Sequence, residues 1–429
     1  MMFFFFALLS DARCDDNTQI HADLKQFFLA GFPEDHLLSP PSNYGQGFLD
    51  GRLKFRFEGE NWSSEIHHVI TMGSKAPTTQ LEIELQNFGM ELEDDSSGSF
   101  MTGVGLQAPE AVELSWKGEE EADLFLQGRT DRLYIKGSIG PIDLQIGRQP
   151  ISFGNGFVFS PLDLVQPFSF ATIDNEYKPG IDAVRVDGYI GMSTHITAVA
   201  AYAGDWDMDG MTYVVNGNTT IGWTDLSLFL GKVRSDSVLG LGIVSSIGPV
   251  GIHSDVSYTI PDNDTEDPFV RTVVGAMHKP FEKSTVNAEL YHQSLGSNDP
   301  KNYLDFSQSD RFGRGEIWLM GQSYASVAWS QELTPLVQGN LSVIGNLNDQ
   351  STMLSPSLSI SVSDNTQAAL GGFMGIGEKP EDIELSDLMG DAQILNSEFG
   401  FFPKMFFPAD TNNPIFPFII CPIESLPPT

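Results

Sequence analysis

Long apolar runs, cysteines and basic residues are all scarce in this sequence. No run approaches the roughly 20 apolar residues that a membrane-spanning helix needs. The 2 cysteines, Cys14 and Cys421, lie near opposite ends without metal-ligand spacing, and a disulfide between them would require an oxidising compartment. Lys and Arg total 23 against 57 Asp and Glu, a net charge of -34, which excludes nucleic acid as a partner because phosphates need basic side chains.

Catalytic motifs are also missing. The 8 histidines show no HExxH or comparable spacing, and there is no nucleophile elbow or phosphate-binding loop. His253 and Asp255 would share a strand face, either as a base with its orienting group or as a polar pair that lines a lumen. We predict that the protein is not an enzyme and has no cofactor, apart from the calcium candidate described below.

Period-two alternation of apolar and polar residues is abundant, and it predicts β-strands. Alternation over residues 131–147 turns back at Ser138-Ile139-Gly140-Pro141, as in a hairpin. It breaks over residues 149–179, a stretch with five Phe and four Pro, and resumes over residues 181–202. Two hairpins joined by a long loop are typical of transmembrane β-barrels, which have short turns at one end and long loops at the other.

These patterns predict an all-β fold, a transmembrane antiparallel up-and-down β-barrel of about 16–18 strands, over residues 50–407. A membrane chain without spanning helices must pair its backbone groups in a closed barrel, and a soluble all-β protein fits the composition less well. Residues 1–12, an apolar run with a small-residue cleavage pattern, are predicted to be a signal peptide, followed by an N-terminal segment over 13–49. Residues 408–429, with 6 prolines, are predicted to be a tail that forms no strand.

A repeated turn predicts the direction of the strands. Ser246-Ile247-Gly248-Pro249 repeats the turn at residues 138–141, so both are expected at the periplasmic end. On the strand near 284–295, apolar residues such as Leu290 are predicted to face lipid, and polar residues such as Glu289 an aqueous lumen. The segments expected at the outer end are 204–210, 261–268, 296–314 and 377–395.

The 149–179 loop and its flanks carry charges of both signs. A loop folded into the lumen, with opposite charges on facing walls, forms a constriction whose field selects solutes. The predicted constriction residues are Arg132, Arg148, Asp163, Asp182, Arg185 and Asp187. Alternatively, Arg148 anchors the loop through carboxylate and carbonyl hydrogen bonds and touches no permeant solute. The loop phenylalanines could form an apolar path for sugars, but we favour packing of the loop against the wall; they are Phe153, Phe157, Phe159, Phe168 and Phe170.

One acidic turn has the spacing of a calcium loop. Asp205, Asp207 and Asp209 alternate and are followed by Gly210, so their carboxylates could converge on one hard cation. The twelfth position is Asn216 rather than a bidentate Glu, and the flanks are predicted strands, which excludes an EF-hand. The three aspartates are therefore a candidate surface Ca²⁺ site, and a solvated acidic turn is the alternative.

The stretch around the long loop resembles a segment of large single-chain bacterial outer-membrane β-barrels of the porin-like and alginate-export-like type. The positions that carry the resemblance are Gly147, Arg148, Gln149, Phe153, Gly154, Pro161, Asp163, Lys178, Pro179, Gly180 and Asp182. Residues 397–403 (SEFGFFP) are also similar to the last strand of such proteins. The resemblance implies a channel or exporter in the outer membrane of a Gram-negative bacterium, without defining its substrate.

From the pattern and the resemblance together, we predict a channel surrounded by outer-membrane lipid and lipopolysaccharide. It would pass small hydrophilic solutes, or export a polysaccharide, by diffusion through a polar lumen. The net charge favours cations, although much of it could sit on outer loops. The alternatives are a barrel enzyme that hydrolyses lipid or peptide, and a structural or adhesive surface barrel.

Overall fold

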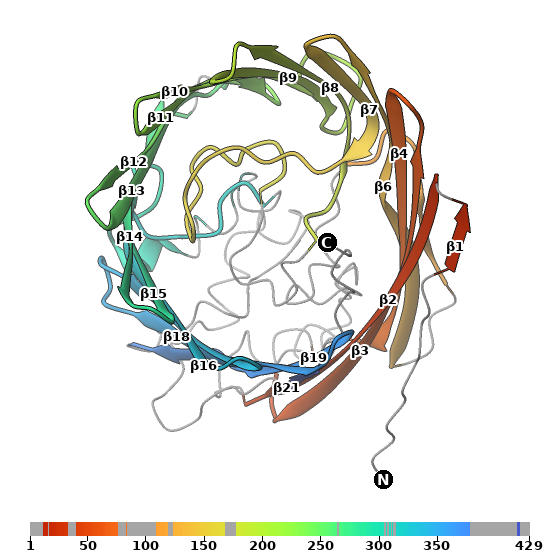
Figure 1. Cartoon of the computed structure of the whole chain (residues 1–429). Helices are drawn as coiled ribbons and strands as arrows, with labels where there is room; N and C mark the ends of the chain where they lie inside the picture. Colours follow the sequence, from red (N-terminus) through yellow and green to blue (C-terminus); the bar gives the residue numbers. More distant parts are fainter. Residues whose placement is uncertain are drawn as a thin grey trace.

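One antiparallel sheet runs around a central space (Figure 1). The computed structural model describes residues 12–15, 17–32, 40–75, 83, 109–118, 123–167, 177–263, 266–303, 306, 309, 311, 315–377 and 418–420. The strands of the ring are β2 (Thr18–Gly31), β3 (Tyr44–Glu58), β4 (Trp62–Ser74), β6 (Leu124–Ile139), β7 (Ile142–Gln149), β8 (Ile181–Ile190), β9 (Thr194–Tyr202), β10 (Met211–Ile221), β11 (Thr224–Val233), β12 (Asp236–Ile247), β13 (Val250–Ile260), β14 (Phe269–Phe281), β15 (Ser284–Gln293), β16 (Ser323–Thr334), β17 (Val337–Asn346), β18 (Thr352–Ser363), β19 (Thr366–Gly371) and β21 (Phe418–Ile420).

Four short elements accompany the ring. They are β1 (Ala12–Asp15) beside β2, β5 (Ser115–Lys117) beside β6, β20 (Met374–Ile376) beside β18, and the 3-10 helix η2 (Pro300–Asn302). Strands β2 to β19 of the ring pair in chain order, all antiparallel, with β4 paired directly to β6. The predicted all-β, antiparallel up-and-down architecture is confirmed, and its strand number lies at the upper end of the expected range.

The ring closes through β21. Ile419 pairs with Ala369 of β19 on one side and with Phe27 of β2 on the other. The prediction that residues 408–429 form no strand was therefore wrong for residues 418–420. These three residues contain no proline, although Pro417 and Pro422 flank the stretch closely.

The barrel also begins earlier than residue 50. All 14 residues of β2 pair with β3, so the expectation that residues 13–49 precede the barrel was wrong for residues 18–31 and 44–49. The alternation is obscured at the end of β2 because both faces are apolar there: Phe28 points outward, whereas Phe27 and Leu29 join an interior apolar cluster with Phe48 and Phe125. The predicted signal peptide, apart from Ala12, lies outside the described residues, as do the 377–395 segment beyond residue 377 and the 397–403 motif.

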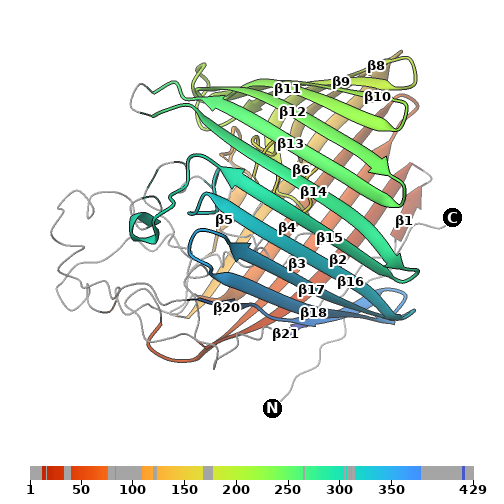
Figure 2. The ribbon, with the colours of Figure 1, turned by 90° about the vertical axis from the view of Figure 1, so that its left-hand side faces the viewer.

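Short turns gather at one end of the barrel (Figure 2). The two Ser-Ile-Gly-Pro turns lie at this same end, as predicted, and Gly140 and Gly248 have positive φ angles of 61° and 59° that suit glycine. The 204–210, 261–268 and 296–314 segments connect strands at the opposite end, which also agrees with the prediction. Among the described residues, no helix is long and apolar enough to cross a membrane.

The outer surface of the ring is apolar, and the inner surface is largely polar. On β12, buried residues alternate with exposed Leu239, Leu241 and Ile243. On β15, Leu290 is 61% exposed, whereas the Glu289 side chain is buried, so the predicted faces of this strand are confirmed. A continuous exposed apolar surface of this kind is typical of contact with lipid rather than water.

Candidate pore constriction

The loop between β7 and β8 folds into the barrel and crosses its interior (Figure 1, yellow). The backbone N–H groups of residues 155–159 donate to two carboxylates on the facing wall. Asp255 of β13 accepts from residues 155 and 156 at 2.5 and 3.3 Å. Glu289 of β15 accepts from residues 157, 158 and 159 at 2.5, 2.9 and 3.1 Å. Five consecutive amides therefore fasten the loop to buried wall carboxylates, which are strong hydrogen-bond acceptors.

Glycines make this close approach feasible. Gly154 has a φ of +99°, a conformation that L side chains rarely adopt, and a Cβ on Gly156 would lie 1.7 Å from the carbonyl oxygen of Phe159. On the wall, Gly240 and Gly242 of β12 point inward, and a Cβ on either would meet the loop, at Leu162 or at Asn155. The Gly-rich loop and the Gly-rich strand thus fit one another.

Apolar packing holds the same loop. Phe159 stacks on Tyr291 with ring centroids 4.9 Å apart, and Phe153 meets Phe229 edge-on at 5.5 Å. The loop residues Ile151, Leu162, Leu164 and Val165 join an interior apolar cluster with wall residues from β8 to β12. The packing interpretation is therefore confirmed for Phe153 and Phe159. Phe157 is 67% exposed, and Phe168 and Phe170 lie outside the described residues.

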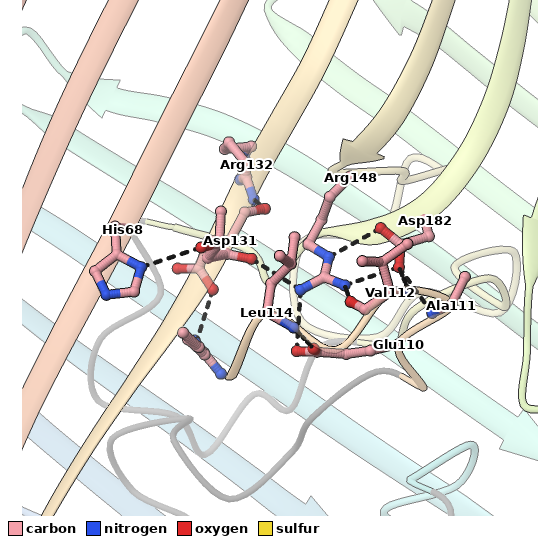
Figure 3. Close-up of polar contacts among 11 residues, drawn as sticks. His68, Glu110, Ala111, Val112, Leu114, Asp131, Arg132, Arg148 and Asp182 are labelled. Atoms are coloured by element: carbon pink, nitrogen blue, oxygen red, sulfur yellow. Dashed lines mark hydrogen bonds and ion pairs between the residues drawn. The ribbon is translucent and has the colours of Figure 1, made fainter. Parts of the chain in front are cut away.

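Arg148 sits at the root of the loop, where β7 ends, and is 3% exposed (Figure 3). Its Nε and Nη2 atoms hold the Asp182 carboxylate side-on at 2.9 and 2.8 Å, and Nη1 lies 3.0 Å from Glu110. The same guanidinium donates to the carbonyl oxygens of Thr130 and Val112 at 3.1 and 2.8 Å. Every nitrogen of the guanidinium is engaged, so the geometry matches the anchor interpretation rather than contact with a solute.

Three other predicted residues lie near this anchor. Asp182 also accepts the N–H of Ala111, which ties the 109–117 segment to β8. Arg132 donates to the carbonyl oxygen of Lys178 at 2.6 Å, and Lys178 forms an ion pair with Asp163 at 2.6 Å. Burial raises the pKa of the Asp163 carboxyl and lowers that of the Lys178 ammonium, while the ion pair opposes both shifts.

Arg185 and Asp187 belong to a separate group. They pair side-on with each other on β8 at 2.8 Å, and Asp187 also accepts from Thr197 and contacts His195 on β9. Both lie nearer the short-turn end than the loop root does. The structure thus brings Arg132, Arg148, Asp163 and Asp182 together but leaves Arg185 and Asp187 apart from them.

A basic cluster that the sequence analysis missed faces the other end of the loop. The Tyr177 ring lies under Lys25 of β2 and under Arg52 and Lys54 of β3, at 5.1, 4.2 and 4.5 Å from its centroid. Lys54 pairs with Asp23 at 2.5 Å. The alternation of Lys54 with apolar neighbours was visible in the sequence, but the inward direction of this face and its meeting with Tyr177 depend on the closed ring.

Two predicted chemical sites are not formed. His253 pairs with Glu289 at 2.8 Å, whereas Asp255 accepts the loop amides, so the His253–Asp255 pair expected by both interpretations is not seen among the described residues. Asp207 accepts the N–H groups of residues 209 and 210, and Asp209 pairs with Lys232. Within the described part of the chain, no three His, Cys, Asp or Glu side chains are placed to hold a metal, so the calcium arrangement predicted for Asp205, Asp207 and Asp209 is not present.

This barrel with an inward loop has the architecture of the porins. No protein-family model matches the sequence, and no curated protein matches it. Solved structures do match over most of the chain. Pseudomonas aeruginosa OpdK with vanillate is 11% identical, with a TM-score of 0.52 over 84% of this chain and 93% of that one.

Two further porin-type structures are similar over more of the chain. Acinetobacter baumannii OccAB4 is 7% identical, with a TM-score of 0.51 over 95% of this chain and 97% of that one. A BenF-like porin from Pseudomonas fluorescens Pf-5 is 7% identical, with a TM-score of 0.51 over 94% and 97%. At these identities the likeness concerns the fold, which is the one that the sequence resemblance implied.

Proposed function

We propose that this protein is an outer-membrane channel through which small hydrophilic solutes diffuse. The observation that carries the proposal is the loop fixed inside the barrel, with five consecutive amides on Asp255 and Glu289 at one wall and Tyr177 against basic side chains at another. An inward loop narrows a polar lumen, and such narrowing is how a large barrel becomes a sieve for small solutes.

The inner wall is charged as well as polar, which suits a hydrophilic solute. Around Tyr177, cations and carboxylates form buried pairs that fix this part of the wall, as in Arg52 with Asp131 at 2.7 Å and Lys54 with Asp23 at 2.5 Å. OpdK, which is similar in fold, has been crystallised with vanillate, so a small organic solute is a reasonable substrate class here too. A polysaccharide would have to pass the same crossing loop, which makes export the weaker proposal.

The apolar exterior suits a bilayer. Exposed Leu, Ile and Val side chains cover the outward faces of the strands, and Trp62, Trp223 and Phe281 are exposed at the short-turn end. Aromatic side chains at both interfaces are typical of outer-membrane barrels. We therefore propose that outer-membrane lipid and lipopolysaccharide surround the ring in a Gram-negative bacterium.

Planar-bilayer recording tests the channel. The purified full chain should produce steady ohmic current steps in KCl, and addition of small solutes should lower the current by occupying the constriction. Ion replacement then gives the ratio of cation to anion permeability. No current from a chain whose folded state is verified, together with hydrolysis of lipid or detergent esters, would overturn the proposal in favour of the barrel enzyme.

A further inference from the structure

A recess lies beside the lumen, between the wall and two inward segments. The 158–167 part of the long loop and residues 316–319 of the β15–β16 connection cover it, and Arg271, Tyr291 and Gln293 form its wall side. Its cavity volume of about 80 Å³ is enough for a molecule of a few heavy atoms, such as a small carboxylate.

Arg271, on β14, is the unusual group in this recess. It is 4% exposed, and its only side-chain hydrogen bond among the described residues is from Nη1 to the carbonyl oxygen of Glu316 at 3.4 Å. Its Nε and Nη2 atoms are buried and have no hydrogen-bond partner in the part of the chain that the structure describes. A buried guanidinium with two unsatisfied donors costs free energy that a ligand could recover.

The carboxylates nearby are already engaged. Glu316 pairs with Arg311 at 3.0 Å, and Asp163 pairs with Lys178 at 2.6 Å. Arg311 also holds Asp236 and Glu266. These hydrogen bonds raise the pKa of the Arg311 guanidinium, although burial acts in the opposite direction. Glu316 and Asp163 are therefore both engaged with other cations.

Unpartnered hydroxyl groups adjoin Arg271. Ser257 of β13 is its cross-strand neighbour and is fully buried, and Thr259 lies two residues further on the same face. Neither Ser257 Oγ nor Thr259 Oγ1 has a hydrogen-bond partner within the described ranges. Four buried polar atoms on two adjacent strands, two of them at the recess itself, thus lack partners there, a combination that is rare in folded proteins.

The unpartnered edge of Arg271 indicates the ligand class. Nε and Nη2 form the side-on edge of the guanidinium, whose two parallel N–H bonds match the two oxygens of a carboxylate. Two other arginines use the same edge: Arg148 holds Asp182 through it at 2.9 and 2.8 Å, and Arg185 holds Asp187 at 2.8 and 3.0 Å. At Arg271 no carboxylate of the described residues occupies this edge.

We propose that this recess binds a small monocarboxylate side-on at Arg271, next to the stacked rings of Phe159 and Tyr291. The bound carboxylate bridges the β13–β14 wall and the two inward segments, and it holds the constriction loop in place. The site lies to one side of the loop and stabilises the protein independently of any conduction. Its failure and a failure of the channel are therefore distinguishable.

Calorimetry on the detergent-solubilised full chain tests the site, with sodium formate replacing sodium chloride at constant sodium concentration. Wild type should bind one formate per chain, and bound formate should raise the unfolding temperature in proportion to the logarithm of its concentration. Arg271→Gln should abolish both effects. Arg271→Lys keeps the positive charge but not the two parallel N–H donors of the guanidinium, so it should weaken formate binding at least tenfold.

The matched control is Arg56→Gln, which removes an exposed guanidinium paired with Glu58 and should bind formate as wild type does. Should Arg271→Gln fail to fold, Arg271→Lys decides the test by itself. Absence of saturable formate binding to wild type overturns the proposal, and so does equal binding by wild type and Arg271→Lys.

Discussion

Arg148 illustrates how a single residue can hold the β7–β8 loop in place. Its guanidinium joins β7, β8 and the 109–117 segment through Asp182, Glu110 and two carbonyl oxygens, all in a nearly dry environment. Burial makes this network costly to break, because removing the cation leaves two carboxylates without compensation.

Arg148→Ala should therefore destabilise the barrel by about 3–5 kcal/mol, the range for breaking one side of a buried ion pair. Equilibrium unfolding by urea in lipid vesicles measures this loss in the free energy of unfolding. Arg185→Ala is the control, since it breaks a similar side-on pair with Asp187 whose Arg side chain is 31% exposed, and it should cost much less. Equal losses for the two variants would contradict the anchoring role of Arg148.

At the scale of elements, the loop and the wall are complementary in shape and in hydrogen bonding. The loop supplies five amides and an apolar underside, and the wall supplies Asp255, Glu289 and two inward glycines. The loop is thus fixed to the barrel wall, and two buried carboxylates accept five of its amide hydrogen bonds.

Glu289→Gln should loosen this loop. A hydrogen bond to a charged acceptor contributes about 1.5–3 kcal/mol, so losing the equivalent of one should raise the population of released loops about ten- to a hundredfold. Single-channel records should then show more frequent transitions and a larger open-state current than wild type. Glu332→Gln makes the same chemical change at the exposed Lys283 pair and should leave the records unchanged. Identical records for wild type and Glu289→Gln would show that these hydrogen bonds do not hold the loop.

At the scale of the whole molecule, closure of the ring depends on a very short strand. β21 contributes three residues that pair with both β19 and β2. Without it, two strand edges would present unpaired N–H and C=O groups to lipid, which membrane barrels do not tolerate.

Ile419→Pro should consequently prevent closure, because proline removes the N–H at the centre of β21. In electrophoresis without heating, a folded barrel migrates as a band separate from that of the heat-denatured chain. In Ile419→Pro the band of the folded barrel should be lost or strongly reduced. Ile419→Ala, which keeps the backbone donor, should retain the band. Survival of the folded band in the proline variant would mean that the ring closes in another way.

Alternation along each strand and turn chemistry were readable from the sequence because both are local. A period of two fixes which side chains face lipid, so Leu290 and Glu289 were assigned correctly without any knowledge of their neighbours. The repeated Ser-Ile-Gly-Pro turn fixed the two ends of the barrel for the same reason. Where both faces of a strand are apolar, as at the end of β2, the local pattern disappears and the strand was missed.

Partnerships across the barrel could be decided only by the tertiary structure. Asp255 accepts a hydrogen bond from the backbone amide of Asn155, which lies 100 residues away in the chain. Tyr177 is hydrogen-bonded to Lys54, which lies 123 residues away. The residues that neighbour Asp255 or Tyr177 in the sequence do not indicate these partners, because the contacts form only when the ring closes and the loop folds inward. The sequence by itself determined a barrel with a polar interior and a long loop, because alternation is local. The fold decided that Arg148 is an anchor and that Arg271 presents the Nε and Nη2 edge of its guanidinium to a recess, because both depend on contacts across the ring.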